Sequence, residues 1–266
     1  MWRSELGLMF RRMRTRALLG VLAGVPVLLA VAVRLSGGPD NGEGPSFLDQ
    51  VSHNGVFAAL AGLTVVIPFF LPLAVAVVSG DTIAGEANLG TLRYLLARPV
   101  GRTRLVLVKY VAALVFCLAA ALTVAIAGLL IGVILFPVGR VTTLSGTQLP
   151  LLEGVVRALA AAGVVGASMA GLAAVGLFVS TLTESPVGAM AATAGLAIVS
   201  EVLDAIPQLR SIHPVLFTHR WLSFGDLLRV PVSLGAIERN IGLQLAWAAV
   251  FVLAAWARFT TKDVLA

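Results

Sequence analysis

Few side chains in this chain could bind a cation or move a proton. The histidines are His53, His213 and His219, and the carboxylates Glu201 and Asp204 stand three residues apart, on one face of a predicted helix. Imidazoles are common metal ligands, so His213 and His219 could hold a metal ion, although isolated loop histidines are the favoured interpretation. The carboxylate pair could bind a cation or a proton, but a solvated helix end is the simpler interpretation.

A second carboxylate pair, Asp81 and Glu86, lies in the polar stretch 79–109 between two apolar runs. Five helical positions separate two side chains by about 140°, so we expect these acids to pair with nearby arginines and not to act together in catalysis. The motifs G-x-x-x-x-G-K-[ST], H-E-x-x-H, C-x-x-C and G-x-S-x-G are all absent. The single cysteine, Cys117, lies in an apolar run. The sequence therefore predicts no catalytic residue, no metal site and no cofactor bound by this chain.

The composition indicates an all-α integral membrane protein. Hydrophobic residues make up 59% of the 266 residues and charged residues only 12%, whereas about a quarter of the residues in soluble domains are charged. The net charge of +6 is typical of arginines at a cytoplasmic membrane surface, and we expect no nucleic-acid partner. The excess of Arg over Lys and the abundance of Ala, Val and Gly favour a prokaryotic plasma membrane.

Hydropathy predicts six transmembrane helices in a single domain, 1–266, with both termini on one side. Pro68 and Pro72 fall in the second apolar run and predict a kink, for which helix packing is favoured over a gating hinge. The alternative of a cleaved signal peptide ending near Ala32 is less favoured, because the first run reaches spanning length. The predicted spans are 17–35, 56–79, 105–136, 158–182, 187–206 and 241–257.

The Lys and Arg distribution predicts cytoplasmic termini. Segments on the side of the N-terminus hold twelve of these residues and the opposite segments hold seven. The four arginines of the outer loop 207–240 argue mildly against this orientation. The apolar residues from Phe217 to Leu228 in that loop recur at helical spacing, which predicts a helix dipping into the outer leaflet. Residues 1–16 predict an amphipathic helix in the membrane interface, with an apolar face of Trp2, Leu6, Met9, Phe10 and Met13.

The polar stretch 79–109 predicts a short cytoplasmic helix between the second and third spans. Asn88 could cap a helix that begins near Leu89, and Pro99 would end it. Basic residues from Arg102 to Lys109 would anchor the next span at the lipid headgroups. Such a helix either lies on the bilayer or fits a groove of another protein. Its apolar stripe consists of Leu89, Leu92, Leu95 and Leu96.

Small residues at four-residue spacing predict close helix packing. Gly163, Ala167 and Gly171 form one row, and Gly188 and Ala192 form a similar pair in the next span. Packing within one subunit is the favoured interpretation, and a dimer face remains open.

The stretch 79–109 resembles the permeases of ABC-2-type transporters. The shared pattern is D-x-x-x-x-E-x-x-x-G-T-L-x-x-L-L-x-x-P-V-x-R, followed by a basic residue that enters a span. The size, the six spans, the basic N-terminus and the long last outer loop also suit that family. The pattern consists here of Asp81, Glu86, Gly90, Thr91, Leu92, Leu95, Leu96, Pro99, Val100, Arg102 and Lys109.

The resemblance implies the membrane subunit of an ATP-driven exporter of drugs, lipids or other amphiphiles. The chain would pair with a second permease copy and a cytosolic ATPase, which would bind ATP and Mg²⁺, so the chain itself would not be an enzyme. The helix after the second span would be the coupling helix, and Glu184, in the loop between the fourth and fifth spans, would be a further ATPase contact. The resemblance also implies re-entrant helices before the sixth span. The implied coupling contacts are Asp81, Glu86, Gly90, Thr91, Leu92, Leu95, Leu96, Pro99, Arg102 and Glu184.

Two other functions remain open. An ATP-independent carrier or channel would need ionisable groups inside the spans, and the predicted span cores lack them. A membrane-bound enzyme or assembly factor would use Glu201 and Asp204 or the loop 207–240 as its site.

Overall fold

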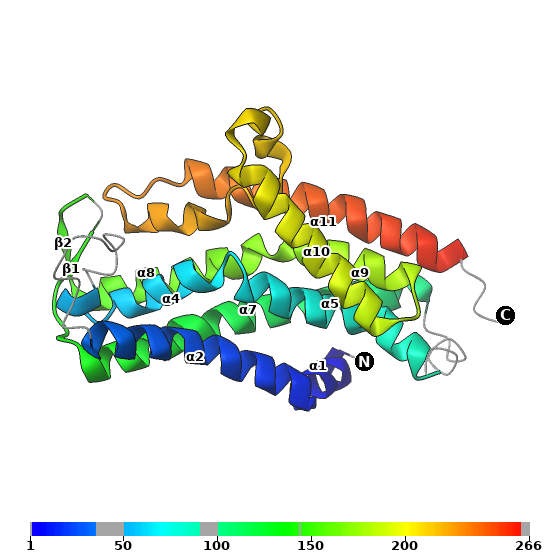
Figure 1. The fold of residues 1–266 in the computed structure, drawn as a ribbon, viewed down its shortest axis with the longest axis horizontal. Coiled ribbons are helices and arrows are strands. Elements are labelled where there is room, and N and C mark those ends of the chain that lie inside the picture. Colours follow the sequence, from blue (N-terminus) through cyan, green and yellow to red (C-terminus); the bar gives the residue numbers. More distant parts are fainter. Residues whose placement is uncertain (1, 36–50, 91–100, 144, 262–266) are drawn as a thin grey trace.

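A computed structural model of the chain describes residues 2–35, 51–90, 101–143 and 145–261. The described part is a bundle of long helices, with three short 3-10 helices and one small hairpin (Figure 1). The helices are α1 (Trp2–Arg11), α2 (Met13–Leu35), α4 (Phe57–Val66), α5 (Phe70–Asn88), α7 (Arg102–Leu135), α8 (Leu151–Ser168), α9 (Ala170–Leu182), α10 (Pro186–Ala205) and α11 (Gly235–Thr261). The remaining elements are β1 (Val141–Thr142), β2 (Gln148–Leu149), η1 (Pro207–Leu209), η2 (His213–Val215) and η3 (Trp221–Leu228).

Six segments of the described chain are long and apolar enough to cross a membrane: α2, α5, α7, α8 with α9, α10 and α11. This confirms the prediction of a multi-pass, all-α membrane protein. The segment α1 and the last turns of α11 lie towards the same end of the bundle (Figure 1).

The second predicted span is broken into two helices. Residues 67–69 are non-helical, and Phe69 has φ −137° and ψ −59°. Pro68 explains the break, since proline cannot donate the helical hydrogen bond and clashes with the preceding turn. Pro72 lies in the first turn of α5, where the missing N–H costs nothing. The helix α5 also continues to Asn88, so Asp81 and Glu86 lie on the helix itself and not in a loop.

The fourth predicted span is interrupted at Met169, which the sequence did not indicate. Side chains from other helices satisfy the backbone groups at this break. The Gly171 N–H donates to Gln244 Oε1 over 3.2 Å, and the Tyr110 hydroxyl donates to the Ala170 carbonyl over 3.1 Å. The break is therefore a contact point between α9, α7 and α11, and Gln244 satisfies the buried Gly171 N–H, which lies in the first turn of α9.

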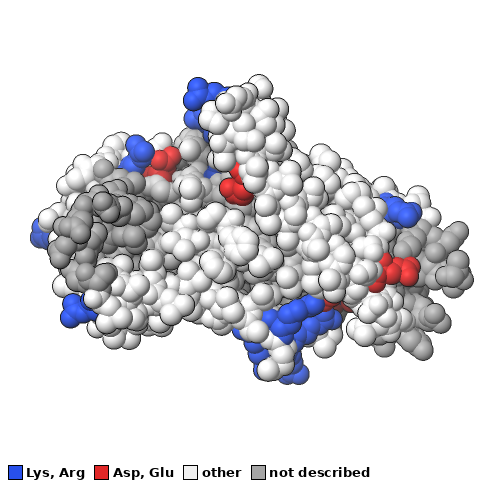
Figure 2. Space-filling view, viewed as in Figure 1, with Lys and Arg blue, Asp and Glu red and all other residues white. Residues whose placement is uncertain are grey.

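The centre of the bundle is formed by α5 and the α8–α9 pair. In the most apolar windows of these segments, 67% and 72% of the residues are buried, against 17% in α11. The helix α5 packs on α9 and α10, and α7 packs on α2, α4 and α8. The face in Figure 2 is almost uncharged across its middle, and basic side chains gather over α1 and the start of α2. Such a surface suits lipid contact.

Close helix approach depends on glycines that differ in part from the predicted row. A Cβ atom on Gly176 of α9 would overlap Ser79 of α5. In the predicted row, Gly163 faces open space and Ala167 is exposed, whereas Gly171 contacts α11. Within one chain, only Gly171 of that row permits a close contact.

Two predicted amphipathic segments pack differently from expectation. The first helix ends at Arg11, and Met13 is 77% exposed, while Met9 and Phe10 pack on the main core. The predicted face of residues 1–16 is therefore split between two helices. The aromatic residues from Phe217 to Phe224 are buried, and η3 packs on α8 and α11. This face contacts protein and not lipid, whereas the helix dipping into the outer leaflet stays a prediction.

Candidate functional site

Six charged side chains meet where α1, the start of α2, the end of α5 and the start of α7 come together. We call them the ion-pair cluster. Two of them, Asp81 and Glu86, lie in the last turns of α5, which precedes the motif segment 91–100 in the chain. The cluster consists of Glu5, Arg12, Arg14, Asp81, Glu86 and Lys109.

Asp81 forms the first half of the cluster. Its carboxylate accepts from Arg12 Nη1 over 2.7 Å and also accepts from Arg14. The Asp81 side chain is 10% exposed, and the two arginine side chains are 47% and 41% exposed. The predicted pairing of Asp81 with arginines is confirmed, but the arginines come from the N-terminal segment. The link joins α5 to the hinge between α1 and α2.

Lys109 forms the second half. Its ammonium group lies 2.5 Å from Glu5 Oε1 and also pairs with Glu86. The Lys109 side chain is only 4% exposed, so the prediction that it anchors α7 at the headgroups was wrong. The reason is that α1 folds back over α7 and brings Glu5 to it. A buried charge needs such partners, because an isolated ion is costly to remove from water.

The cluster is electrically balanced, with three acidic and three basic side chains. A cavity of about 60 Å³ lies between them, lined also by apolar groups such as Met9 and Val78. Drug-sized ligands occupy pockets of roughly 300–1,000 Å³, so this cavity has room only for water. The arrangement suits a fixed joint between helices and not a ligand site.

The helix α5 ends at Asn88, beside the motif segment. Gly90 has φ +67°, and its N–H donates to the Ala87 carbonyl. This left-handed conformation ends helices and favours glycine, which has no Cβ to clash. The prediction that Asn88 caps a new helix was wrong, because Asn88 is the last residue of α5. The predicted contacts Thr91, Leu92, Leu95, Leu96 and Pro99 lie outside the described residues.

The start of α7 is fixed to the end of α11. Arg102 Nη1 donates to the Thr260 carbonyl over 2.7 Å and to the Phe259 carbonyl over 3.3 Å. Trp256 Nε1 donates to Thr103 Oγ1 over 2.8 Å. A cation at the C-terminal carbonyls of a helix also interacts favourably with the helix dipole. Arg102 therefore anchors α7 to protein, where lipid headgroups were expected.

Glu184 lies exposed in the turn between α9 and α10. The next residue, Ser185, caps α10. One turn earlier along α9, Ser180 Oγ accepts from the backbone N–H groups of Ile83 and Ala84. The end of α9, which precedes the turn with Glu184, is therefore linked to α5 between Asp81 and Glu86.

Sequence reasoning missed the roles of Glu5, Arg12 and Arg14. Their partners lie 104, 69 and 67 residues away in the chain, so no local spacing revealed the pairs. One sequence feature did indicate that such pairs exist. Lys109 and Asp81 each border an apolar run, where a charged side chain needs a partner of opposite charge.

The fold defines a multi-pass α-helical membrane protein with a balanced charged joint at one end. Residues 28–265 match the family described as "Protein of unknown function (DUF2705)", and the chain belongs to that family. A search of curated proteins found no match.

Proposed function

We propose that this chain is the permease subunit of an ATP-driven exporter of the ABC-2 type, in a prokaryotic plasma membrane. Its termini and the motif segment 91–100 would face the cytoplasm. A second permease copy and a cytosolic ATPase, which binds ATP and Mg²⁺, would complete the transporter. The observation that carries the proposal is the anchoring of both helices that flank the motif segment.

The anchoring suits transmission of force. On one side of the segment, Asp81 and Glu86 tie α5 to α1, α2 and α7. On the other side, Arg102 ties α7 to α11. A displacement of the segment by an ATPase would therefore move both helices and, through α5, the buried centre of the bundle. A flexible attachment would dissipate that displacement.

The contacts implied by the resemblance fall into two groups in this proposal. Asp81, Glu86 and Arg102 bind other helices of this chain, so their proposed role is to position the coupling segment. The residues that would touch the ATPase are Glu184, Gly90, Thr91, Leu92, Leu95, Leu96 and Pro99. The transported substrate would be a drug, lipid or other amphiphile, in keeping with the apolar helix surfaces.

The test is purification of the full chain from its native membranes in mild detergent. We expect a co-purified ATPase that carries a P-loop and hydrolyses ATP in the complex. Leu92→Asp would place a charge on the apolar stripe, and we expect loss of the ATPase at normal permease levels. The matched control is Leu234→Asp, an exposed leucine before α11. Full ATPase retention and activity in Leu92→Asp would contradict the proposal.

One observation favours a second candidate, an ATP-independent carrier. The observed helices α5 and α7 include Asp81, Glu86 and Lys109, and buried charges often line ion pathways. The charge balance of the cluster argues against this role, because each group already has a partner. Transport by the purified chain alone in liposomes, without any ATPase, would favour the carrier.

A further inference from the structure

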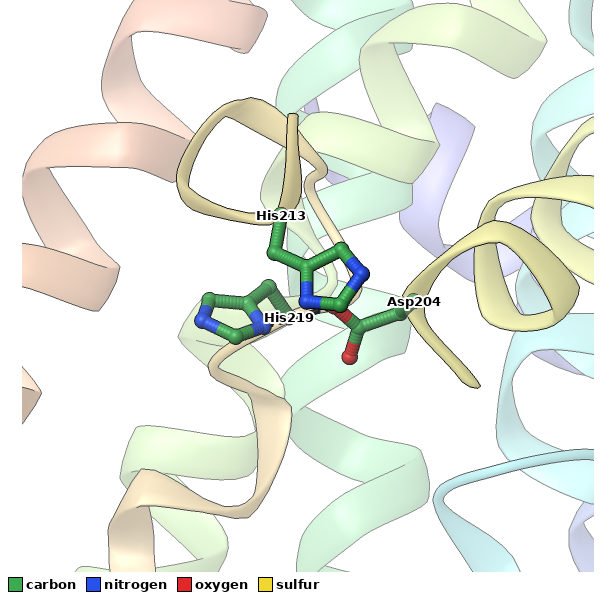
Figure 3. A group of neighbouring side chains, drawn as sticks. All are labelled: Asp204, His213 and His219. Carbon is green, nitrogen blue, oxygen red and sulfur yellow. Dashed lines mark hydrogen bonds and ion pairs between the residues drawn. The ribbon is translucent and has the colours of Figure 1, made fainter. Parts of the chain in front are cut away.

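Two histidines and a carboxylate meet at the end of α10. Asp204 lies in the last turn of α10, His213 begins η2, and His219 lies in the turn before η3 (Figure 3). One potential ligand atom from each residue lies within 4.8 Å of the other two. We call these three residues the His/Asp cluster. The sequence favoured isolated loop histidines, and the fold instead directs both rings at one carboxylate.

The distances resemble those of a metal site without its ion. Asp204 Oδ1 lies 2.6 Å from His219 Nδ1 and 3.8 Å from His213 Nδ1. The two imidazole ring centroids are 5.6 Å apart. Tetrahedral zinc with bonds of about 2.0–2.2 Å separates its ligand atoms by roughly 3.3 Å. The two observed distances lie on either side of this value, and all three ligand atoms lie within 4.8 Å of one another, so side-chain adjustment and not refolding would complete the geometry.

A hydrogen bond to a backbone carbonyl fixes the tautomer of His213. It leaves the nitrogen that faces the carboxylate unprotonated. His213 Nε2 lies 3.1 Å from the Ile206 carbonyl oxygen. A carbonyl can only accept, so Nε2 carries the proton and Nδ1 of the neutral ring is an acceptor. This Nδ1 and the Asp204 carboxylate are therefore two acceptors that face each other. Only a cation or an additional proton makes that arrangement favourable, and metal-binding histidines are typically oriented by such a bond to a carbonyl.

We propose that the His/Asp cluster binds a divalent transition-metal ion of the zinc class. His213 Nδ1, His219 Nδ1 and an oxygen of Asp204 would be the protein ligands, and water would occupy the fourth position. On binding, His219 would carry its proton on Nε2 and leave Nδ1 free for the metal. Two imidazoles and one carboxylate suit zinc or copper, whereas calcium and magnesium prefer all-oxygen sites.

Access supports this site. The side chains of His213, Asp204 and His219 are 12%, 23% and 31% exposed, so an ion could enter without unfolding.

The bound ion would clamp the segment 206–219 to α10. Three hydrogen bonds outside the cluster already hold this region. Ser200 Oγ lies 2.8 Å from Thr218 Oγ1, Trp247 Nε1 donates to the Val215 carbonyl over 2.9 Å, and Gln244 Nε2 donates to the Phe217 carbonyl over 2.7 Å. A metal would add a further link, on the side that the predicted topology places outside the cell. The inference does not depend on the proposed exporter function.

The test uses the full chain without an affinity tag, purified in detergent and stripped with a chelator. Equilibrium dialysis against Zn²⁺ should give one ion per chain, and Zn²⁺ should raise the thermal unfolding temperature. Co²⁺ should give the visible absorption of a tetrahedral site. His213→Gln and His219→Gln should each weaken Zn²⁺ binding by about tenfold or more. His53→Gln, which changes a histidine outside the cluster, should leave binding unchanged.

Absence of Zn²⁺ binding in the wild-type chain would overturn the proposal, as would wild-type affinity in both histidine variants. Gel filtration in detergent would show whether those variants fold. If they do not, Cu²⁺ electron paramagnetic resonance of the wild-type chain decides, because two coordinated imidazoles split the signal and an all-oxygen site does not. Each outcome is independent of ATPase co-purification.

Discussion

The ion-pair cluster and the His/Asp cluster differ in how their charges are balanced. In the ion-pair cluster, each carboxylate faces at least one cationic side chain, and the three acids match three bases. In the His/Asp cluster, one carboxylate faces two imidazoles, and His213 presents a lone pair to it. The first cluster is complete without a ligand and fixes helices. The second is completed by a cation.

The two clusters also differ in how deeply their side chains are buried. Lys109 and Asp81 are nearly inaccessible, with side chains 4% and 10% exposed, whereas His219 is 31% exposed. Buried ion pairs must be formed during folding, because separating them later leaves a charge in a low dielectric. A partly exposed cluster can gain and lose an ion in the folded protein. The comparison therefore predicts different effects of substitution in the two clusters.

The largest expected effect is that of Lys109→Met, which tests the balance of the ion-pair cluster. The substitution leaves Glu5 and Glu86 without their shared cation, and loss of one partner in a buried pair costs about 3–5 kcal/mol. Thermal unfolding in detergent should show a clear fall in the unfolding temperature. Arg104→Met is the matched control, since Arg104 is an exposed base on the same helix. Equal stability of the two variants would show that the cluster is not a structural joint.

The helical architecture was predictable from sequence, but the clusters were only partly so. Six apolar runs predicted the six spans, because a helix needs about 20 consecutive apolar residues to cross the hydrocarbon layer of a membrane. The break at Met169 was not predicted, since no proline marks it and its backbone partners, Gln244 and Tyr110, come from other helices. The sequence predicted that Asp81 pairs with arginines. It did not predict that these arginines come from the N-terminal segment, because the packing of that segment on α5 is a tertiary contact.

The His/Asp cluster shows the same limit. The six-residue spacing of His213 and His219 allowed a metal site, but it could not distinguish that site from isolated loop histidines. The deciding features are the end of α10, which places Asp204 beside the loop, and the Ile206 carbonyl, which orients His213. Both depend on how the chain turns after Ala205. Pro207 ends the helix locally, but the path of the loop beyond it depends on contacts with other segments, such as that of Trp247 with the Val215 carbonyl.

The next prediction compares one carboxylate from each cluster. Asp81→Asn removes the anion shared by two guanidinium groups, and we expect a loss of about 1–3 kcal/mol. Asp204→Asn removes one hydrogen-bonded contact at a partly exposed site, so a loss of about 0.5–1.5 kcal/mol is expected in metal-free protein. Unfolding temperatures with and without Zn²⁺ would measure both. Only Asp204→Asn should abolish the stabilisation by Zn²⁺, and an equal Zn²⁺ response in both variants would remove the proposed distinction.

The smallest expected effect concerns redundancy within the ion-pair cluster. Arg14→Ala leaves Arg12 on Asp81, and both arginine side chains are more than 40% exposed. Solvent screens such pairs, so we expect a loss of at most about 1 kcal/mol. The double variant Arg12→Ala with Arg14→Ala should lose more than the sum of the single losses, because Asp81 is then buried without a cation. A double-mutant cycle of unfolding temperatures measures this coupling. Additive losses would mean that Asp81 is solvated despite its burial, and that the two clusters differ less than their contacts indicate.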